Sequence, residues 1–159
     1  EHLTTSSFLF GGRPASADFA LYGQLTQLAL FDPTPMAICV REAPRVYAWV
    51  ENMEELSGLE PTAADWRSRD DLGPTFHALL TEFGRVYAPY LLANAAAVSA
   101  GAKKMETTID GARWEQNPFP YQKKCLTWLR ESRNSLSSAD QSALAGLLNG
   151  TGADQIFVD

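Results

Sequence analysis

The sequence is poor in the residues from which metal and redox sites are built. Its 159 residues include two cysteines, Cys39 and Cys125, and two histidines, His2 and His77. The cysteines are too far apart for a CxxC pair, and two of them make no disulfide framework. So few and scattered ligands predict no zinc site or other metal site. This cysteine usage is typical of a reducing compartment, so we expect a cytoplasmic protein.

Clusters of positive charge and long apolar runs are also missing. The chain has 13 Lys and Arg against 19 Asp and Glu, a formal charge of −6, and no basic run exceeds two residues. A surface that follows phosphates needs clustered Lys and Arg, so we expect no nucleic-acid partner. The best candidate for a membrane span, residues 86–102, contains Pro89 and Asn94. It is shorter than the roughly 20 apolar residues that a span needs, so no membrane segment is expected.

Catalytic motifs are missing as well. Gly11-Gly12 follows no βαβ pattern that would make it a phosphate loop, and no pair of carboxylates lies in an apolar setting. His77 has no Ser, Cys or Asp partner at motif spacing. Cys125 lies on an apolar helix stripe, where core packing is the better interpretation. We therefore predict no catalytic residue, and the sequence identifies no cofactor-binding residue.

Apolar residues are plentiful, and their spacing predicts a mainly α-helical fold. Hydrophobic residues make up 45% of the chain and charged residues 20%, enough for a packed core without disulfides. The first predicted helix, 17–30, is apolar nearly all round, which is typical of a helix in the middle of a core. Pro89 interrupts a long helical pattern that starts at Pro74, so we expect a kink near Arg85.

Further helices are expected on both sides of this pattern. They are predicted at 35–41, from Pro44 towards Gly58, after Pro120, and from a capping box at Ser138 and Gln141 to Asn149. Residues 59–73 between them are predicted to form a loop with Trp66 as its anchor. The stripe expected to be buried on the helix after Pro120 comprises Tyr121, Cys125, Trp128, Leu129 and Leu136.

A small β-hairpin is predicted at about 104–116. Asp110-Gly111 is a favoured two-residue turn between two short alternating runs. Pairing across this turn sets Ile109 opposite Ala112 and Thr107 opposite Trp114. An isolated hairpin is marginally stable, so one of its faces must lie against helices. That face comprises Met105, Thr107, Ile109, Ala112 and Trp114.

Two motifs near the start of the chain resemble a known family. Residues 8–21, FLFGGRPASADFAL, resemble the approach to the central buried helix in the helical C-terminal domain of glutathione S-transferases. Residues 43–53, APRVYAWVENM, resemble the next helix of that domain. The resemblance covers about residues 1–58 and implies a helical bundle. Residues 59–159 match no family pattern, and we expect this helical extension with its hairpin to pack on the first part as one domain.

The first motif predicts a helix cap formed by Asp18 and Ser16. A carboxylate in the first turn accepts hydrogen bonds from backbone N–H groups and lies at the positive end of the helix dipole. In the family a Ser or Thr usually stands three residues before the Asp, where this chain has Ala15 and then Ser16 one place late. This departure retains the carboxylate half of a capping box and weakens the hydroxyl half.

The resemblance implies a role for the chain that depends on a second domain. In the family a preceding thioredoxin-like domain binds glutathione and supplies the activating Ser, Tyr or Cys. We therefore expect a segment of a longer protein that forms the hydrophobic co-substrate side and part of a homodimer surface. Glutathione is the implied cofactor of that longer protein, and a small hydrophobic electrophile is the implied substrate. The chain alone is not expected to be catalytic.

Two alternatives remain open at this point. Some proteins of this fold are non-enzymatic scaffolds or regulators, and the chain fits such an interaction module. The second alternative is a small-molecule-binding helical domain with a pocket near the kink at Pro89. Polar residues on an apolar helix often line a pocket, and here they are Arg85, Tyr87, Tyr90 and Asn94. The competing interpretation is that both tyrosines pack and bond outward while Asn94 caps a helix or crosses to a neighbouring helix.

Overall fold

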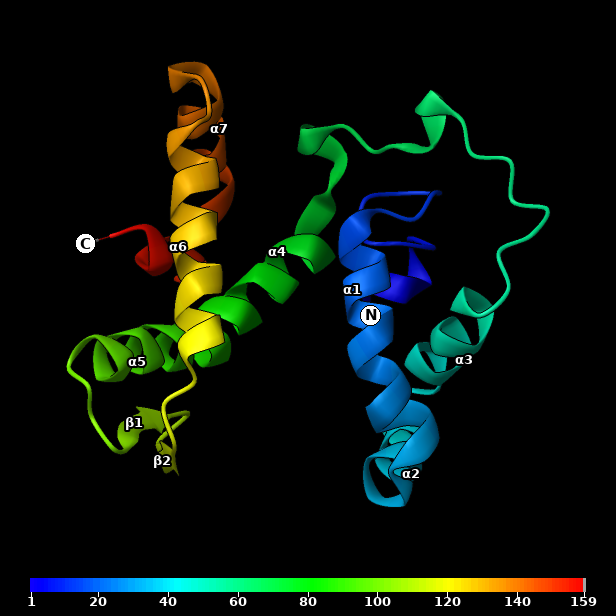
Figure 1. Ribbon diagram of the computed structural model, residues 1–159. Coiled ribbons are helices and arrows are strands. Elements are labelled where there is room, and N and C mark those ends of the chain that lie inside the picture. The colour runs from blue at the N-terminus through cyan, green and yellow to red at the C-terminus, as the bar shows by residue number, and fades with distance from the viewer. Residues whose placement is uncertain (159) are drawn as a thin grey trace. The chain divides into compact units, whose positions relative to one another are not determined.

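The computed structural model describes residues 1–158, which form helices and one two-stranded sheet (Figure 1). A mainly α-helical fold with one β-hairpin is therefore confirmed. The chain divides into two compact units, Glu1–Phe76 and His77–Asp159, termed the first and second units. The helices and strands are α1 (Ser16–Thr26), α2 (Pro33–Glu42), α3 (Pro44–Met53), α4 (Gly73–Glu82), α5 (Ala88–Ser99), β1 (Met105–Ile109), β2 (Ala112–Gln116), α6 (Pro120–Asn134) and α7 (Ser138–Leu148).

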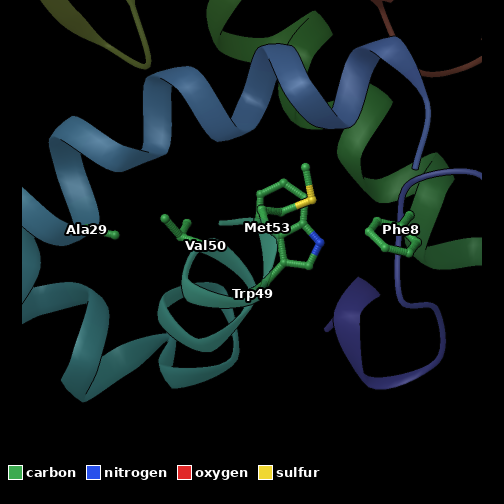
Figure 2. Packing of buried hydrophobic residues seen from close by; sticks show 5 residues of the cluster. All are labelled: Phe8, Ala29, Trp49, Val50 and Met53. Atoms are coloured by element: carbon green, nitrogen blue, oxygen red, sulfur yellow. The ribbon is translucent and has the colours of Figure 1, made fainter. Parts of the chain in front are cut away.

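The core of the first unit lies between α1, α3 and the segment before α1. Trp49, Val50 and Met53 of α3 are buried together with Phe8 and Ala29. Figure 2 shows Trp49 and Met53 beside each other, between Ala29 and Phe8. The Trp49 indole Nε1 donates to the Ser7 carbonyl at 3.0 Å. This bond satisfies the polar end of the ring while the rest of it packs in the core.

The helix α1 buries one face only. It continues through a π-helical turn, Gln27–Phe31, and its inward side contributes Tyr22, Leu25 and Leu30 to the core. The prediction that this helix is enclosed on all sides is wrong for the first unit. Phe19 and Leu28 are each 51% exposed and Leu21 is 42% exposed. The helix has neighbours on its inner side and leaves apolar residues uncovered on both flanks.

The loop after α3 returns to the segment that precedes α1. Residues 62–67, called the strap below, exchange backbone hydrogen bonds with that segment: Gly12 donates to the Asp65 carbonyl at 2.8 Å and Arg67 donates to the Phe10 carbonyl at 2.8 Å. Gly11 lies between them at φ +133°, where a Cβ would stand 2.2 Å from the Asp65 carbonyl oxygen. Only glycine fits this conformation and this approach. The first unit thus extends beyond residue 58, and the packing of the whole extension on it stays a prediction.

In the second unit the predicted kink takes the form of a π-helical turn. Phe83–Tyr87 connects α4 to α5 with this wider turn, and Pro89 stands in the first turn of α5. Gly84 in this turn lies against the backbone of residues 151–153. α5 then packs against α6 through buried Leu91 and Leu126, together with Ile156 near the end of the chain.

The hairpin has the predicted register. Ile109 pairs with Ala112 and Thr107 with Trp114. Asp110 and Gly111 have φ of 52° and 77°, as a type I′ turn requires. Of the face expected to be covered, Met105 is 1% exposed whereas Trp114 is 48% exposed. Met105 is thus the buried residue of this face, and Thr107 and Ile109 are partly buried.

Two predictions about the last helices are wrong. The stripe expected to be buried on α6 is largely exposed, with Tyr121 at 56% and Trp128 at 45%, and the buried residue of α6 is Leu126. The cap of α7 is Ser137 rather than Ser138. The Ser137 hydroxyl accepts from Asp140 N at 3.2 Å and donates to the Asp140 carboxylate at 2.7 Å. Within residues 1–158, no helix has the length and apolar character that a membrane crossing requires.

Candidate functional site

The residues predicted around the kink form a network with neighbouring elements of the second unit. Asn94 is fully buried in α5. Its Nδ2 donates to the Phe119 carbonyl at 2.9 Å, and its Oδ1 accepts from Phe119 N at 2.7 Å. Both halves of one side-chain amide thus bind one backbone residue. Asn94 fixes the segment that leads into α6.

The Tyr90 hydroxyl also joins α5 to α6 and to the hairpin. It donates to Gln122 Oε1 at 2.7 Å and accepts from Gln116 Nε2 at 2.9 Å. Its ring meets the Trp114 ring edge-on, with centroids 6.3 Å apart. Tyr90 and Asn94 thus both bond to neighbouring elements of the second unit.

Tyr87 and Arg85 complete the predicted set on the outer side of the π turn. The Tyr87 ring packs near Phe83 and Tyr90, at centroid distances of 5.2 and 5.9 Å. Partial burial, reinforced by the nearby Tyr90 and Cys125 groups, raises the pKa of the Tyr87 hydroxyl. Arg85 binds Glu82 at 2.6 Å and also forms an ion pair with Asp110 of the hairpin turn.

The charges at this turn are stabilised in their ionised forms. Hydrogen bonds to Glu82 and Asp110 raise the pKa of Arg85 above its ordinary value. The same bond to Arg85 lowers the pKa of Glu82. A carboxylate whose pKa is lowered in this way is a weak proton acceptor, and the arginine is a permanent cation. The group therefore ties the hairpin to the π turn, and a ligand role for Arg85, Tyr87, Tyr90 and Asn94 stays a prediction.

The predicted helix cap at the start of α1 is more deeply buried than the sequence indicates. Asp18 is fully buried, and its two carboxylate oxygens accept from Leu9 N and Ala15 N, each at 2.9 Å. The residue that precedes the helix is Ala15, and Ser16 is the first helical residue. Asp18 thus joins the start of α1 to the loop before it, and the carboxylate alone makes these bonds.

One cavity of the first unit was not foreseen. A groove of about 260 Å³ lies between residues 3–8 and α3. Its apolar lining includes Phe8, Trp49 and Met53, and Arg45 and Asn52 add polar groups. The spacing of Trp49, Met53 and Leu56 marks the α3 side of this groove. Nothing in the local sequence marks the opposite side, which comes from a segment more than forty residues earlier.

His2 also departs from expectation, because a residue so near the start of the chain would ordinarily be exposed. Its ring is buried, with Nδ1 3.0 Å from Thr75 Oγ1 and Nε2 3.2 Å from the Phe8 carbonyl. The partner Thr75 is distant in sequence, so no local pattern could have revealed it. His77 is exposed, with Nε2 3.5 Å from the Asn149 carbonyl.

The described residues offer little to a metal ion. In the part of the chain that the structure describes, no three His, Cys, Asp or Glu side chains are grouped so that they could hold one. Cys39 and Cys125 are both free thiols and both partly buried. The Cys39 thiol lies 3.8 Å from the Ala43 carbonyl, within the turn between α2 and α3.

Comparison with known proteins supports the resemblance of the first unit. Residues 1–57 match the family model of the glutathione S-transferase C-terminal domain. This stretch holds α1, α2, α3 and the buried Asp18 cap, and the match confirms the likeness that the two motifs indicated. The residues after 57 are unmatched. No curated protein and no solved structure matches the chain.

Proposed function

We propose that the first unit is the helical portion of a glutathione-transferase-like protein. In this proposal it forms the hydrophobic co-substrate side, and glutathione binds to a thioredoxin-like domain outside these residues. The proposed setting is cytoplasmic and the proposed assembly a homodimer, as the resemblance implies. The substrate class is a small hydrophobic electrophile.

The uncovered apolar flanks of α1 are the observation that carries this proposal. Phe19, Leu21 and Leu28 are about half exposed although the helix begins at a fully buried carboxylate. Phe31 at the end of the same helix is 73% exposed. Large apolar side chains grouped on one element mark a surface that another body covers. In the matched family, α1 corresponds to the central buried helix, so a neighbouring domain is the natural cover.

The first test is conjugation by the chain itself. Because the proposal places the glutathione site and the activating residue elsewhere, the 159 residues should not conjugate glutathione to 1-chloro-2,4-dinitrobenzene above the uncatalysed rate. The native gene product that contains these residues should do so. Measurable turnover by the isolated chain would refute the proposal that the glutathione site and the activating residue lie outside these residues.

The second test asks whether α1 is covered in the native gene product. Leu28→Ser removes a half-exposed side chain, so it should change the Tm of the isolated chain little. In the native product the same change should lower the Tm by several degrees and raise the KM for the electrophile. Leu59→Ser, at an exposed apolar residue of the loop after α3, is the matched control and should have little effect in either protein.

The outcomes of this comparison separate an enzyme from an interaction module. If Leu28→Ser has the same small effect in both proteins, no further domain covers α1 and the proposal fails. If it destabilises a native product that conjugates no glutathione, the domain belongs to a non-catalytic scaffold of the same fold.

A further inference from the structure

α6 of the second unit has an apolar stripe on the side away from the core. Tyr121, Trp128 and Leu129 are 56%, 45% and 42% exposed. The opposite side carries buried Leu126 and Arg130, whose guanidinium donates to the Ile156 carbonyl at 2.7 Å and the Val158 carbonyl at 2.8 Å. α6 is the long helix beside α7 and above the hairpin in Figure 1. Along this outer stripe the Tyr121 and Trp128 rings meet edge-on, with centroids 6.1 Å apart, and the partly buried Cys125 lies near Tyr87 of the π turn.

The outer stripe has the spacing of a helix–helix seam. Tyr121, Cys125, Trp128 and Ser132 follow one another at intervals of four, three and four residues. This alternation is the 3.5-residue period of paired helices. The side chains also alternate in size, because a large ring at 121 and at 128 is followed by a small side chain at 125 and at 132.

Two opposite charges flank the seam on the same side. Lys124 and Glu131 are seven residues apart, so they occupy equivalent positions two turns from each other. The Lys124 ammonium lies over the Trp128 ring, 4.8 Å from its centroid. Neither residue has an ion-pair partner within residues 1–158. At about 10 Å along the helix they are too far apart to pair with each other.

We propose that a second copy of this chain binds to the outer stripe, with the two α6 helices antiparallel about a twofold axis. This arrangement sets Trp128 opposite the partner's Cys125 and Tyr121 opposite the partner's Ser132, so that each large side chain meets a small one. Lys124 then faces the partner's Glu131, and the twofold axis repeats every contact. When two copies of one helix pair in antiparallel order, the same flank of each copy lies against the other. Lys124 and Glu131 carry opposite charges on that flank, so each can face the opposite charge of the partner copy.

The size of the stripe sets the strength of the association. A stable interface usually buries about 800 Å² on each partner, and a single pair of helices of this length buries less. The proposed dimer is therefore weak, with a dissociation constant on the order of micromolar to tens of micromolar. It uses the second unit and is independent of the α1 surface in the proposed function.

The test is charge reversal measured by sedimentation equilibrium from about 1 to 500 µM, a range that brackets such a constant. Lys124→Glu and Glu131→Lys each bring like charges together twice, so each should raise the dissociation constant about tenfold or more. The double variant Lys124→Glu with Glu131→Lys should restore it, because only the other copy can supply the opposite charge. Lys103→Glu, an exposed lysine outside α6, makes the same change in net charge and should leave dimerisation unchanged.

A cross-linking experiment tests the register. In a Cys39→Ser, Cys125→Ser background, Tyr121→Cys with Ser132→Cys should give a disulfide-linked dimer under mild oxidation, and Tyr121→Cys alone should not. Circular dichroism checks that every variant is folded. The proposal is overturned if the chain is monomeric over the whole range or if the double charge reversal fails to restore dimers. A dimer that is insensitive to the α6 variants also overturns it and assigns the association to another surface.

Discussion

At the scale of single residues, Asp18 connects the start of α1 to the loop before it. Its carboxylate is fully buried and accepts two backbone hydrogen bonds, at 2.9 Å each. Asp18→Ala should lower the free energy of unfolding by about 2–4 kcal/mol, because two N–H groups lose their acceptor. Asp32→Ala is the matched control, since Asp32 caps α2 from an exposed position through one bond to Thr34 N at 3.1 Å.

Urea unfolding followed by tryptophan fluorescence measures both variants. The Asp32 variant should lose about 1 kcal/mol, the ordinary value of an exposed cap. Equal losses for the two variants would contradict a special role for the buried carboxylate.

Gly84 is a second residue whose replacement has a calculable consequence. A Cβ at Gly84 would lie 2.2 Å from the Thr151 carbonyl oxygen and 2.6 Å from Ala153 N, both of them backbone atoms. Gly84→Ala should therefore destabilise the second unit by about 1–3 kcal/mol, as overpacking does. Gly146→Ala in α7, where a Cβ meets nothing within 4 Å, should instead stabilise the helix by about 0.5–1 kcal/mol.

Opposite signs for these two Gly→Ala changes are the result to look for in thermal unfolding. If Gly84→Ala were as harmless as Gly146→Ala, the packing of residues 151–153 on the π turn would be wrong.

The sequence could predict Asp18 but only part of its environment. A carboxylate in the first turn of a helix is a local signal, and Ala15 lies within the same motif. Leu9, the second donor, belongs to the folded loop and follows from no spacing rule. Asn94 and His2 illustrate the same limit, because their partners Phe119 and Thr75 are brought to them by the fold.

At the scale of elements, the strap should respond to acid. Two hydrogen bonds from Thr62, one from its N at 2.5 Å and one from its hydroxyl at 2.9 Å, lower the pKa of Asp65 below its ordinary 3.8. A depressed folded-state pKa contributes stability above the unfolded value, and this contribution is lost as the pH falls through the folded value. The stability supplied by Asp65 is thus complete above about pH 4 to 5, and it is lost as the pH falls further, through the lowered pKa of the folded state.

Asp65→Asn provides the measurement for this element. The difference in urea midpoint between the original chain and Asp65→Asn should be constant near neutral pH and shrink towards about pH 3. Asp70→Asn removes the same charge from an exposed carboxylate that lacks these Thr62 bonds, and its profile should differ. A difference that widened on acidification would contradict the expected direction of the effect.

The elements also show where periodicity is sufficient and where it is not. The hairpin register followed from the Asp110-Gly111 turn, because a two-residue turn leaves one way to pair the flanking residues. The helix α6 has apolar residues on two sides. The spacing of apolar residues along its sequence alone cannot decide which side packs against a neighbouring element. The buried side is that of Leu126 and of Arg130, which bonds the Ile156 carbonyl, and the side with more apolar residues is exposed.

At the scale of the whole molecule, the two compact units should lose structure separately. Hydrogen exchange followed by mass spectrometry can detect this, because local opening exposes only the amides of the unit concerned. Asp18→Ala should accelerate exchange mainly in peptides from residues 1–57, and Gly84→Ala mainly in peptides from residues 88–157. Acceleration throughout the chain by either variant would show one cooperative unit instead.

The two units also differ in how much of their fold and role could be predicted from the sequence. The first 57 residues carry two family motifs, so their fold and proposed role were open to inference. The second unit carries no such motif. Its organisation depends on Asn94, Tyr90 and Gly84, each of which acts through partners more than twenty residues away. Composition and the spacing of apolar residues predict helices in this unit. The contacts between those helices, which come from residues distant in sequence, determine how they pack.

The space that Gly84 leaves open makes this glycine informative in other sequences. Its backbone is helical, so conformation alone does not require glycine, and a glycine inside a helix costs about 0.5–1 kcal/mol relative to alanine. The close approach of residues 151–153 is what compensates for that cost. A relative that lacks this closing segment has no reason to retain glycine there. In an alignment, the residue at position 84 can therefore distinguish chains that share the second unit from chains that share only the first.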